Sequence, residues 1–160
     1  MPSSRNRRTR SRSRPSRSLP EASPDPLGVA VRALAQRDLS AHELADRLAR
    51  RGVAPAQRQE VIERLARAGY VDDARFALSR ARVLAGRGLG DAAIRADLEQ
   101  RGIDADAVSD AVSALEAEPE RARREAARLG GGVRAARALA CKGFAGDSVE
   151  AAVGLEDTEP

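Results

Sequence analysis

Apolar residues recur at helical spacing along most of the chain. Pairs four residues apart, such as Leu44 with Leu48 and Ile94 with Leu98, place apolar side chains on one face of a helix. No run of β-branched residues alternates with polar ones, as a strand would require. The pattern therefore predicts an all-α protein with helices at residues 27–37, 41–51, 55–68, 73–86, 91–101, 105–117, 119–129, 133–142 and 147–154.

Three of these helices end in the same string, Leu-x-x-basic-Gly-apolar, with its glycine at Gly52, Gly102 and Gly143. Glycine adopts the left-handed conformation just after a helix without a Cβ clash, and the next residue then folds back onto the last turn. In every copy, the leucine that opens the string and the residue that follows its glycine are both apolar, as this motif requires. The string therefore predicts three helix stops, and its period of about 40 to 50 residues is typical of helical repeats.

The predicted helix starts follow the same repeat. Ser40 and Glu43 form a capping box, and Asp72 and Asp104 stand where single residues can cap the next helices. The third repeat has Gly130–Gly132 at this place and no capping side chain. We therefore expect its helix to be the least stable of the three.

The helices group into three trios. One trio is too small for a large core, so neighbouring trios are expected to stack into an elongated, curved body. The chain then divides into a disordered Arg/Ser/Pro-rich tail at 1–26, three-helix modules at 27–69, 70–118 and 119–155 (the third degenerate), and an acidic disordered end at 156–160.

Composition narrows the class of protein. Aromatic residues make up only 2% of the 160 residues, and tryptophan is absent. No window approaches the roughly 20 apolar residues of a membrane span, and no apolar segment follows the charged start as in a secretory signal. A single cysteine, Cys141, excludes an internal disulfide, and we expect it to be buried or half-buried. These features predict a cytoplasmic monomer without membrane contact.

The positive charge is concentrated in the tail. Residues 1–20 contain no acid and seven arginines, which are Arg5, Arg7, Arg8, Arg10, Arg12, Arg14 and Arg17. Without them, 21 basic residues stand against 24 acidic ones, so the remainder is slightly acidic. The tail suits weak binding to the phosphates of single- or double-stranded DNA, and a solubilising extension explains it equally well.

We find no set of residues suited to catalysis, cofactor binding or metal binding. Asp72 and Asp73 are adjacent at a helix start and do not face each other, so capping explains them better. His42, the only histidine, has no second ligand at a useful spacing. Gly130–Gly132 lacks the Lys-Ser/Thr that follows a phosphate-binding loop. The chain is therefore predicted to bind rather than to catalyse.

Arginines are the candidate binding residues. The second module carries the main set, Arg80, Arg82, Arg87, Arg95 and Arg101. The third module carries Arg121, Arg123, Arg124, Arg128, Arg134, Arg137 and Lys142. Such groups suit phosphates or acidic protein surfaces, and the alternative is a solvated helix face with internal ion pairs.

The stretch Gly-Tyr-Val-Asp-Asp-Ala-Arg-Phe-Ala at residues 69–77 resembles the RecX family, the regulators of the RecA recombinase. The family's first repeat typically ends in Gly-Tyr/Phe-aliphatic-Asp/Asn-Asp-x-x-Phe/Tyr-Ala. The matching residues are Gly69, Tyr70, Asp72, Asp73 and Phe76. We expect their role to be mainly structural, with both aromatic rings in the core or between modules. The resemblance covers roughly residues 27–155 and is weaker in the third module.

The resemblance implies three tandem three-helix modules that lie in the groove of the RecA–DNA filament and bridge its protomers. It also implies restraint of the ATPase, coprotease and strand-exchange activities of RecA in DNA repair and recombination. A stand-alone helix-turn-helix protein, using residues 41–68 on DNA, is the alternative. Glu60 and Glu63 in its second helix speak against it.

Overall fold

The computed structural model describes residues 25–154, and every regular element in that range is a helix. The nine helices are α1 (Pro26–Leu34), α2 (Ala41–Ala49), α3 (Pro55–Arg67), α4 (Asp73–Gly86), α5 (Asp91–Gln100), α6 (Ala105–Ser113), α7 (Glu118–Arg128), α8 (Gly132–Cys141) and α9 (Gly146–Val153). The predicted all-α class is confirmed, although α1 and α6 end a few residues earlier than expected. The predictions for residues 1–24 and 155–160 lie outside the described residues.

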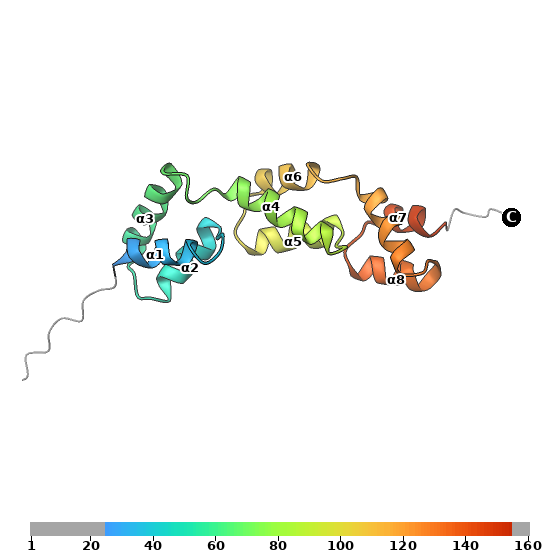
Figure 1. Ribbon diagram of the computed structural model, residues 1–160, viewed down its shortest axis with the longest axis horizontal. Helices are drawn as coiled ribbons and strands as arrows, with labels where there is room; N and C mark the ends of the chain where they lie inside the picture. Colours follow the sequence, from blue (N-terminus) through green and yellow to red (C-terminus); the bar gives the residue numbers. More distant parts are fainter. Residues whose placement is uncertain (1–24, 155–160) are drawn as a thin grey trace, which may run out of the picture.

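The helices form three modules, each of three consecutive helices, arranged in an elongated and slightly arched row (Figure 1). Each module has its own cluster of buried apolar residues, one within α1–α3, one within α4–α6 and one within α7–α9. The first cluster also contains Val71, which follows α3 and which the sequence had placed in the second module. The chain is therefore a linear repeat, in which each module contacts only its neighbours.

The middle helix of each module supplies the centre of its core. Leu44 and Leu48 of α2 are fully buried, and Ile94 and Leu98 occupy the same positions in α5. The third core is built largely from alanine, which buries less apolar surface than leucine or isoleucine. Its burial therefore contributes less to stability than that of the first two modules.

The three predicted helix stops are confirmed. Gly52, Gly102 and Gly143 all have positive φ, at 77°, 73° and 81°. In each turn the amide of the residue after the glycine donates to the carbonyl of the leucine five residues earlier, over 3.2 Å. That bond closes the reversal expected when an apolar residue folds back onto the last turn.

The predicted helix starts are also found. Ser40 and Glu43 form a complete capping box on α2. The side chains of Asp72 and Asp104 accept hydrogen bonds from the amides of Arg75 and Ala107. By contrast, no side chain caps α8, as expected from the glycines before it.

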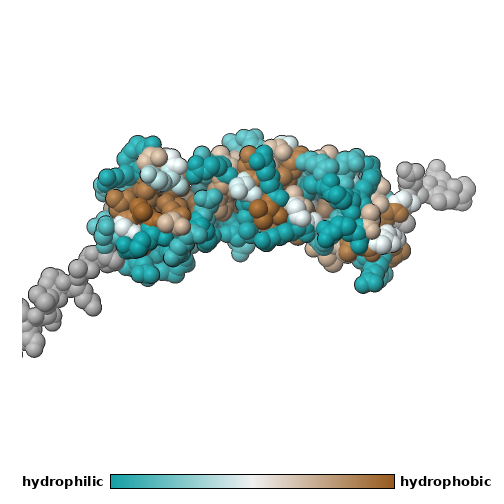
Figure 2. Space-filling view, in the orientation of Figure 1, coloured by the Kyte–Doolittle hydropathy of each residue, from teal (hydrophilic) through white to brown (hydrophobic). Residues whose placement is uncertain are grey.

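No helix in residues 25–154 is long and apolar enough to cross a membrane. The face seen in Figure 2 is mainly hydrophilic, with apolar residues gathered over the first module. The first module also holds a hollow of about 580 Å³, lined by Leu27, Val31 and Leu34 of α1 and by residues at the end of α3.

Candidate functional site at the module junctions

The first junction joins the start of α2 to the end of α5. Ser40 is completely buried there, and its hydroxyl donates to the carbonyl of Arg101 over 2.7 Å. A Cβ on Gly102 would lie 2.5 Å from the Cβ of His42, so the two modules touch closely at this point. The helix N-terminus, where backbone amides point outward, thus meets carbonyls at a helix C-terminus, and the two helix dipoles attract each other.

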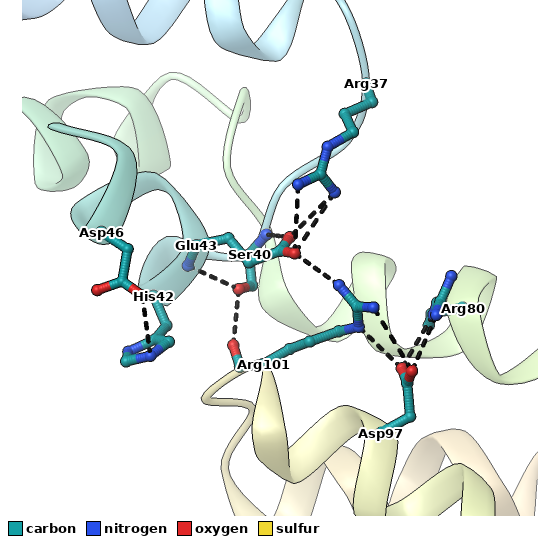
Figure 3. Close-up of polar contacts among 8 residues, drawn as sticks. All are labelled: Arg37, Ser40, His42, Glu43, Asp46, Arg80, Asp97 and Arg101. Atoms are coloured by element: carbon teal, nitrogen blue, oxygen red, sulfur yellow. Dashed lines mark hydrogen bonds and ion pairs between the residues drawn. The ribbon is translucent and has the colours of Figure 1, made fainter. Parts of the chain in front are cut away.

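Four charged side chains extend this junction (Figure 3). Arg101 donates to Glu43 of the first module over 2.6 Å and to Asp97 of its own helix over 2.8 Å. Arg80 of α4 makes two further hydrogen bonds to Asp97, of 2.9 and 2.8 Å. The hydrogen bonds from Arg80, and then those from Arg101, hold the pKa of Asp97 well below its usual range.

The first residue of α4 completes the contact. A carboxylate oxygen of Asp73 accepts a hydrogen bond from the amide of Ala41 over 2.8 Å. That amide is one of those left unpaired at the start of α2. Burial raises the pKa of Asp73, and the hydrogen bond from Ala41 opposes this shift. Asp73 therefore caps a helix of the preceding module, whereas its neighbour Asp72 caps its own helix.

The second junction repeats this arrangement one module later. The amide of Asp91, the first residue of α5, donates to the carboxylate of Glu118, the first residue of α7, over 2.7 Å. The amide of Gly90 donates to the carbonyl of Lys142 over 2.9 Å. A Cβ on Gly90 would overlap the carbonyl group of Gly143, so glycine is required by the close approach of two backbones.

A buried arginine fixes the second junction further. Arg121 of α7 is 5% exposed and donates to the carbonyl of Leu89, over 2.9 Å, and to the carboxylate of Asp91. Its Nε donates to the carbonyl of Glu116 over 2.9 Å, and its guanidinium carbon lies 6.0 Å from the centre of the Phe144 ring. This side chain is therefore buried between the second and third modules and joins them by hydrogen bonds.

Both junctions thus follow one rule. The start of the middle helix in one module docks on the glycine turn that ends the middle helix of the next module. An acidic residue at the first position of the next module's entry helix accepts the first amide of the docked helix. The sequence indicated the glycine turns and the caps but not this pairing, although the equivalent positions of Ser40 and Gly90 in the repeat are a signal for it.

The five candidate arginines of the second module fall into two groups. Arg80 and Arg101 belong to the first junction, where both are held in ion pairs. Arg82 and Arg87 are exposed and Arg95 is partly exposed. In the part of the chain that the structure describes, no ion pair involves these three. Their role in binding stays a prediction.

Most basic residues of the third module are also paired with acids. Arg123 and Arg124 form ion pairs at the exposed surface. Arg128 is itself exposed and pairs with Glu125 of α7. Lys142 pairs with the buried Glu125 of α7. The pairs of Arg123 and Arg124 are of the kind that the alternative, a solvated helix face with internal ion pairs, predicts, and a role of the third module's basic residues in binding stays a prediction.

Two expectations about individual side chains are wrong. Tyr70 is 66% exposed rather than in the core, because Gly69 turns the chain sharply after α3 and leaves the ring at the edge of the apolar hollow. Phe76 is buried as expected. Cys141 is exposed rather than buried, because Leu139 takes the core-facing position in the last turn of α8.

The described residues include no group of three or more His, Cys, Asp or Glu side chains that could hold a metal ion. The polar groups of the two junctions instead form hydrogen bonds and ion pairs with one another. Within residues 25–154, every buried side-chain nitrogen or oxygen has a hydrogen-bond partner. The polar groups of these junctions therefore serve to hold the helices of neighbouring modules together.

Comparison with known families gives two matches in this region. A model described as "RecX, first three-helix domain" matches residues 27–73. A model described as "RecX, second three-helix domain" matches residues 72–112. Together they cover more than half of the chain and include the whole first junction.

Named relatives match over most of their length. The regulatory protein RecX of Xanthomonas axonopodis pv. citri (strain 306) is 36% identical over 144 residues, which cover 82% of this chain and 89% of the relative. The regulatory protein RecX of Stenotrophomonas maltophilia (strain R551-3) is 33% identical over 137 residues, covering 79% of this chain and 84% of the relative.

Solved structures agree on the fold. The crystal structure of RecX from Lactobacillus salivarius superposes with a TM-score of 0.70 at 21% identity, covering 81% of this chain and 93% of that one. A second crystal structure, of a regulatory protein RecX, gives a TM-score of 0.71 at 20% identity, covering 82% and 72%. On the family models and the similarity over most of its length, the chain belongs to the RecX family.

Proposed function

We propose that the chain is a regulator of the RecA recombinase that acts without catalysis of its own. Membership of the RecX family, whose relatives carry the name regulatory protein, is the observation that supports this function most strongly. The junctions add a physical argument. Their polar groups are engaged in holding helices together, as suits a protein that presents an extended surface to a partner.

In this proposal the row of modules lies along the groove of the RecA–DNA filament and bridges neighbouring protomers. An elongated repeat suits a filament because successive modules can meet successive protomers at a fixed spacing. The two junctions set that spacing, since each is fixed by several hydrogen bonds. Binding would then restrain the ATPase, coprotease and strand-exchange activities of RecA.

The candidate arginines take different parts in this model. We propose that Arg82, Arg87 and Arg95 contact acidic groups of RecA or the phosphates of DNA. Arg80 and Arg101 would act mainly by keeping the first two modules in register, because their guanidinium groups are held by Asp97 and Glu43. Affinity for free DNA is expected to be weak and to come from the arginines of the tail.

The RecA ATPase on single-stranded DNA tests the proposal. The chain is added in increasing amounts at fixed salt, and inhibition is expected at well below one chain per RecA. A variant with Arg82, Arg87 and Arg95 changed to glutamate should need a higher concentration for the same inhibition. The matched control is Arg67→Glu, a reversal at a 72% exposed side chain at the end of α3.

The same experiment separates the alternative function. A stand-alone helix-turn-helix protein would leave the RecA ATPase unchanged and would bind a particular duplex sequence tightly. Unchanged ATPase together with such binding would overturn the proposal.

A further inference from the structure

Among residues 25–154, no helix start docks on the glycine turn of the first module. In the second and third modules the corresponding turns are covered, Gly102 by the start of α2 and Gly143 by the start of α5. Around Gly52, by contrast, no described atom other than those of Gly52 and its two chain neighbours lies within 4 Å of the position that a Cβ would take. Within the described residues, the Gly52 turn is therefore an uncovered copy of a surface on which a helix start docks at Gly102 and at Gly143.

The backbone of this turn matches the two covered turns. Val53 donates to the carbonyl of Leu48 over 3.2 Å, the same bond and length as in the other two turns. Gly52 has a φ of 77°, against 73° and 81° for its counterparts. The carbonyl of Arg51 stands at the position of the carbonyls of Arg101 and Lys142, which accept hydrogen bonds at the junctions.

The side chains around the uncovered turn are basic. Residues 46–58 contain one acid, Asp46, and the arginines Arg47, Arg50, Arg51 and Arg58. Arg50 and Arg51 are exposed and form no ion pair with any described residue. Arg51 is the counterpart of Arg101, whose guanidinium binds the capping carboxylate of Glu43.

We propose that the Gly52 turn, with Arg50 and Arg51, is a docking site for the first turn of a helix in a partner protein, with a carboxylate at the third position of that helix. At the covered turns a helix start fills this place and donates to the carbonyls, through the amides of Gly90 and Ala92 at the second junction and through the Ser40 hydroxyl at the first. At the first junction the capping glutamate adds an ion pair. The proposal does not depend on the partner being RecA.

A second copy of the chain is a poor occupant of the site. Of the three middle helices, α2 and α5 start on a glycine turn of the next module, and among the described residues only the start of α8 has no such turn to dock on. Its third position holds the exposed Arg134, where α2 has Glu43. Arg134 would face Arg51 of the other copy, and like charges at such a contact oppose association.

One helix turn buries far less area than the roughly 1,600 Å² of a standard stable interface. The contact is therefore weak when isolated, and nuclear magnetic resonance is the suitable method. The probe is a helical peptide carrying residues 38–49 of this chain, extended by alanines to keep it helical. It is titrated into the ¹⁵N-labelled full-length chain, and the matched control peptide carries Glu43→Lys.

The amide signals of Gly52 and Val53 are expected to shift with the peptide, and those of the covered turns at Gly102 and Gly143 to stay in place. The control peptide should bind roughly fivefold more weakly, the range of an exposed ion pair. An Arg51→Glu chain should reverse that preference, whereas Arg67→Glu should leave it unchanged. Dispersed amide signals show that each variant is folded.

Three results would overturn the proposal. The first is an absence of shifts at the Gly52 turn, and the second is a peptide preference that does not change with the charge of residue 51. The third is end-to-end association of the unmodified chain through this turn, detected by sedimentation and abolished by Arg51→Glu. All three leave the RecA ATPase result unaffected, so this inference and the proposed function can fail separately.

Discussion

Alanine substitutions at three glycines distinguish two costs, the backbone strain at a helix stop and the crowding of the contact between modules. Gly52→Ala forces a side chain into the left-handed region but meets no described atom. Gly90→Ala has the opposite character, because φ at Gly90 is −81° and the added Cβ disturbs only the contact with the backbone of Gly143 and Phe144. Gly102→Ala combines both effects, with a positive φ and a Cβ 2.5 Å from that of His42.

The left-handed conformation costs about 1–2 kcal/mol for a residue with a Cβ, which is the expected loss of stability for Gly52→Ala. Overpacking a close contact costs about 1–3 kcal/mol. Gly102→Ala should therefore lose about 2–5 kcal/mol. Gly90→Ala should lose about 1–2 kcal/mol, because alanine also lowers the entropy of the unfolded chain by an amount worth about 0.4–1 kcal/mol.

Urea unfolding followed by far-ultraviolet circular dichroism gives the free energy of unfolding of each variant. Small-angle X-ray scattering of the native proteins then shows whether the row has changed its shape. We expect altered scattering for Gly90→Ala and Gly102→Ala and unchanged scattering for Gly52→Ala. Equal losses for Gly52→Ala and Gly102→Ala, with no loss for Gly90→Ala, would refute the close packing of the two junctions.

Three further predictions concern charged groups. Arg121→Met should cost about 3 kcal/mol in urea unfolding, because it leaves buried partners unpaired, whereas Arg124→Met at a 61% exposed ion pair should leave the stability nearly unchanged. The pKa of Asp97 is depressed in the folded chain, so its stabilisation is present above about pH 4 and is lost as the pH falls. Asp97→Asn should therefore reduce the loss of stability measured on acidification, and an unchanged pH profile would contradict this. Removal of residues 1–23 should weaken DNA binding and flatten its dependence on salt, and an unchanged slope in a fluorescence-anisotropy titration would show that the tail does not contact phosphates.

Local structure could be predicted from the sequence because its causes are local. The φ required at Gly102 and the capping box of Ser40 depend only on residues within one or two helical turns. The periodicity of apolar residues likewise places Leu44 and Leu48 on one face of α2. These features locate the helices and the three modules.

The junctions depend instead on residues far apart in the chain. Nothing near Asp73 indicates that it accepts a hydrogen bond from Ala41, 32 residues away. The same holds for Arg121 and Leu89, also 32 residues apart. The exposure of Tyr70 was missed for a related reason, since an aromatic ring can close a core or border a hollow, and the local sequence is the same in both cases.

Co-sedimentation with RecA filaments on single-stranded DNA tests the central claim most directly. Increasing amounts of the full-length chain are added to filaments held in their ATP-bound form, and the chain in the pellet is measured until it saturates. If the row of modules bridges neighbouring protomers, saturation is expected below one chain per RecA. Saturation at one chain or more per RecA would contradict the bridging arrangement, and absence of the chain from the pellet would contradict regulation through the filament.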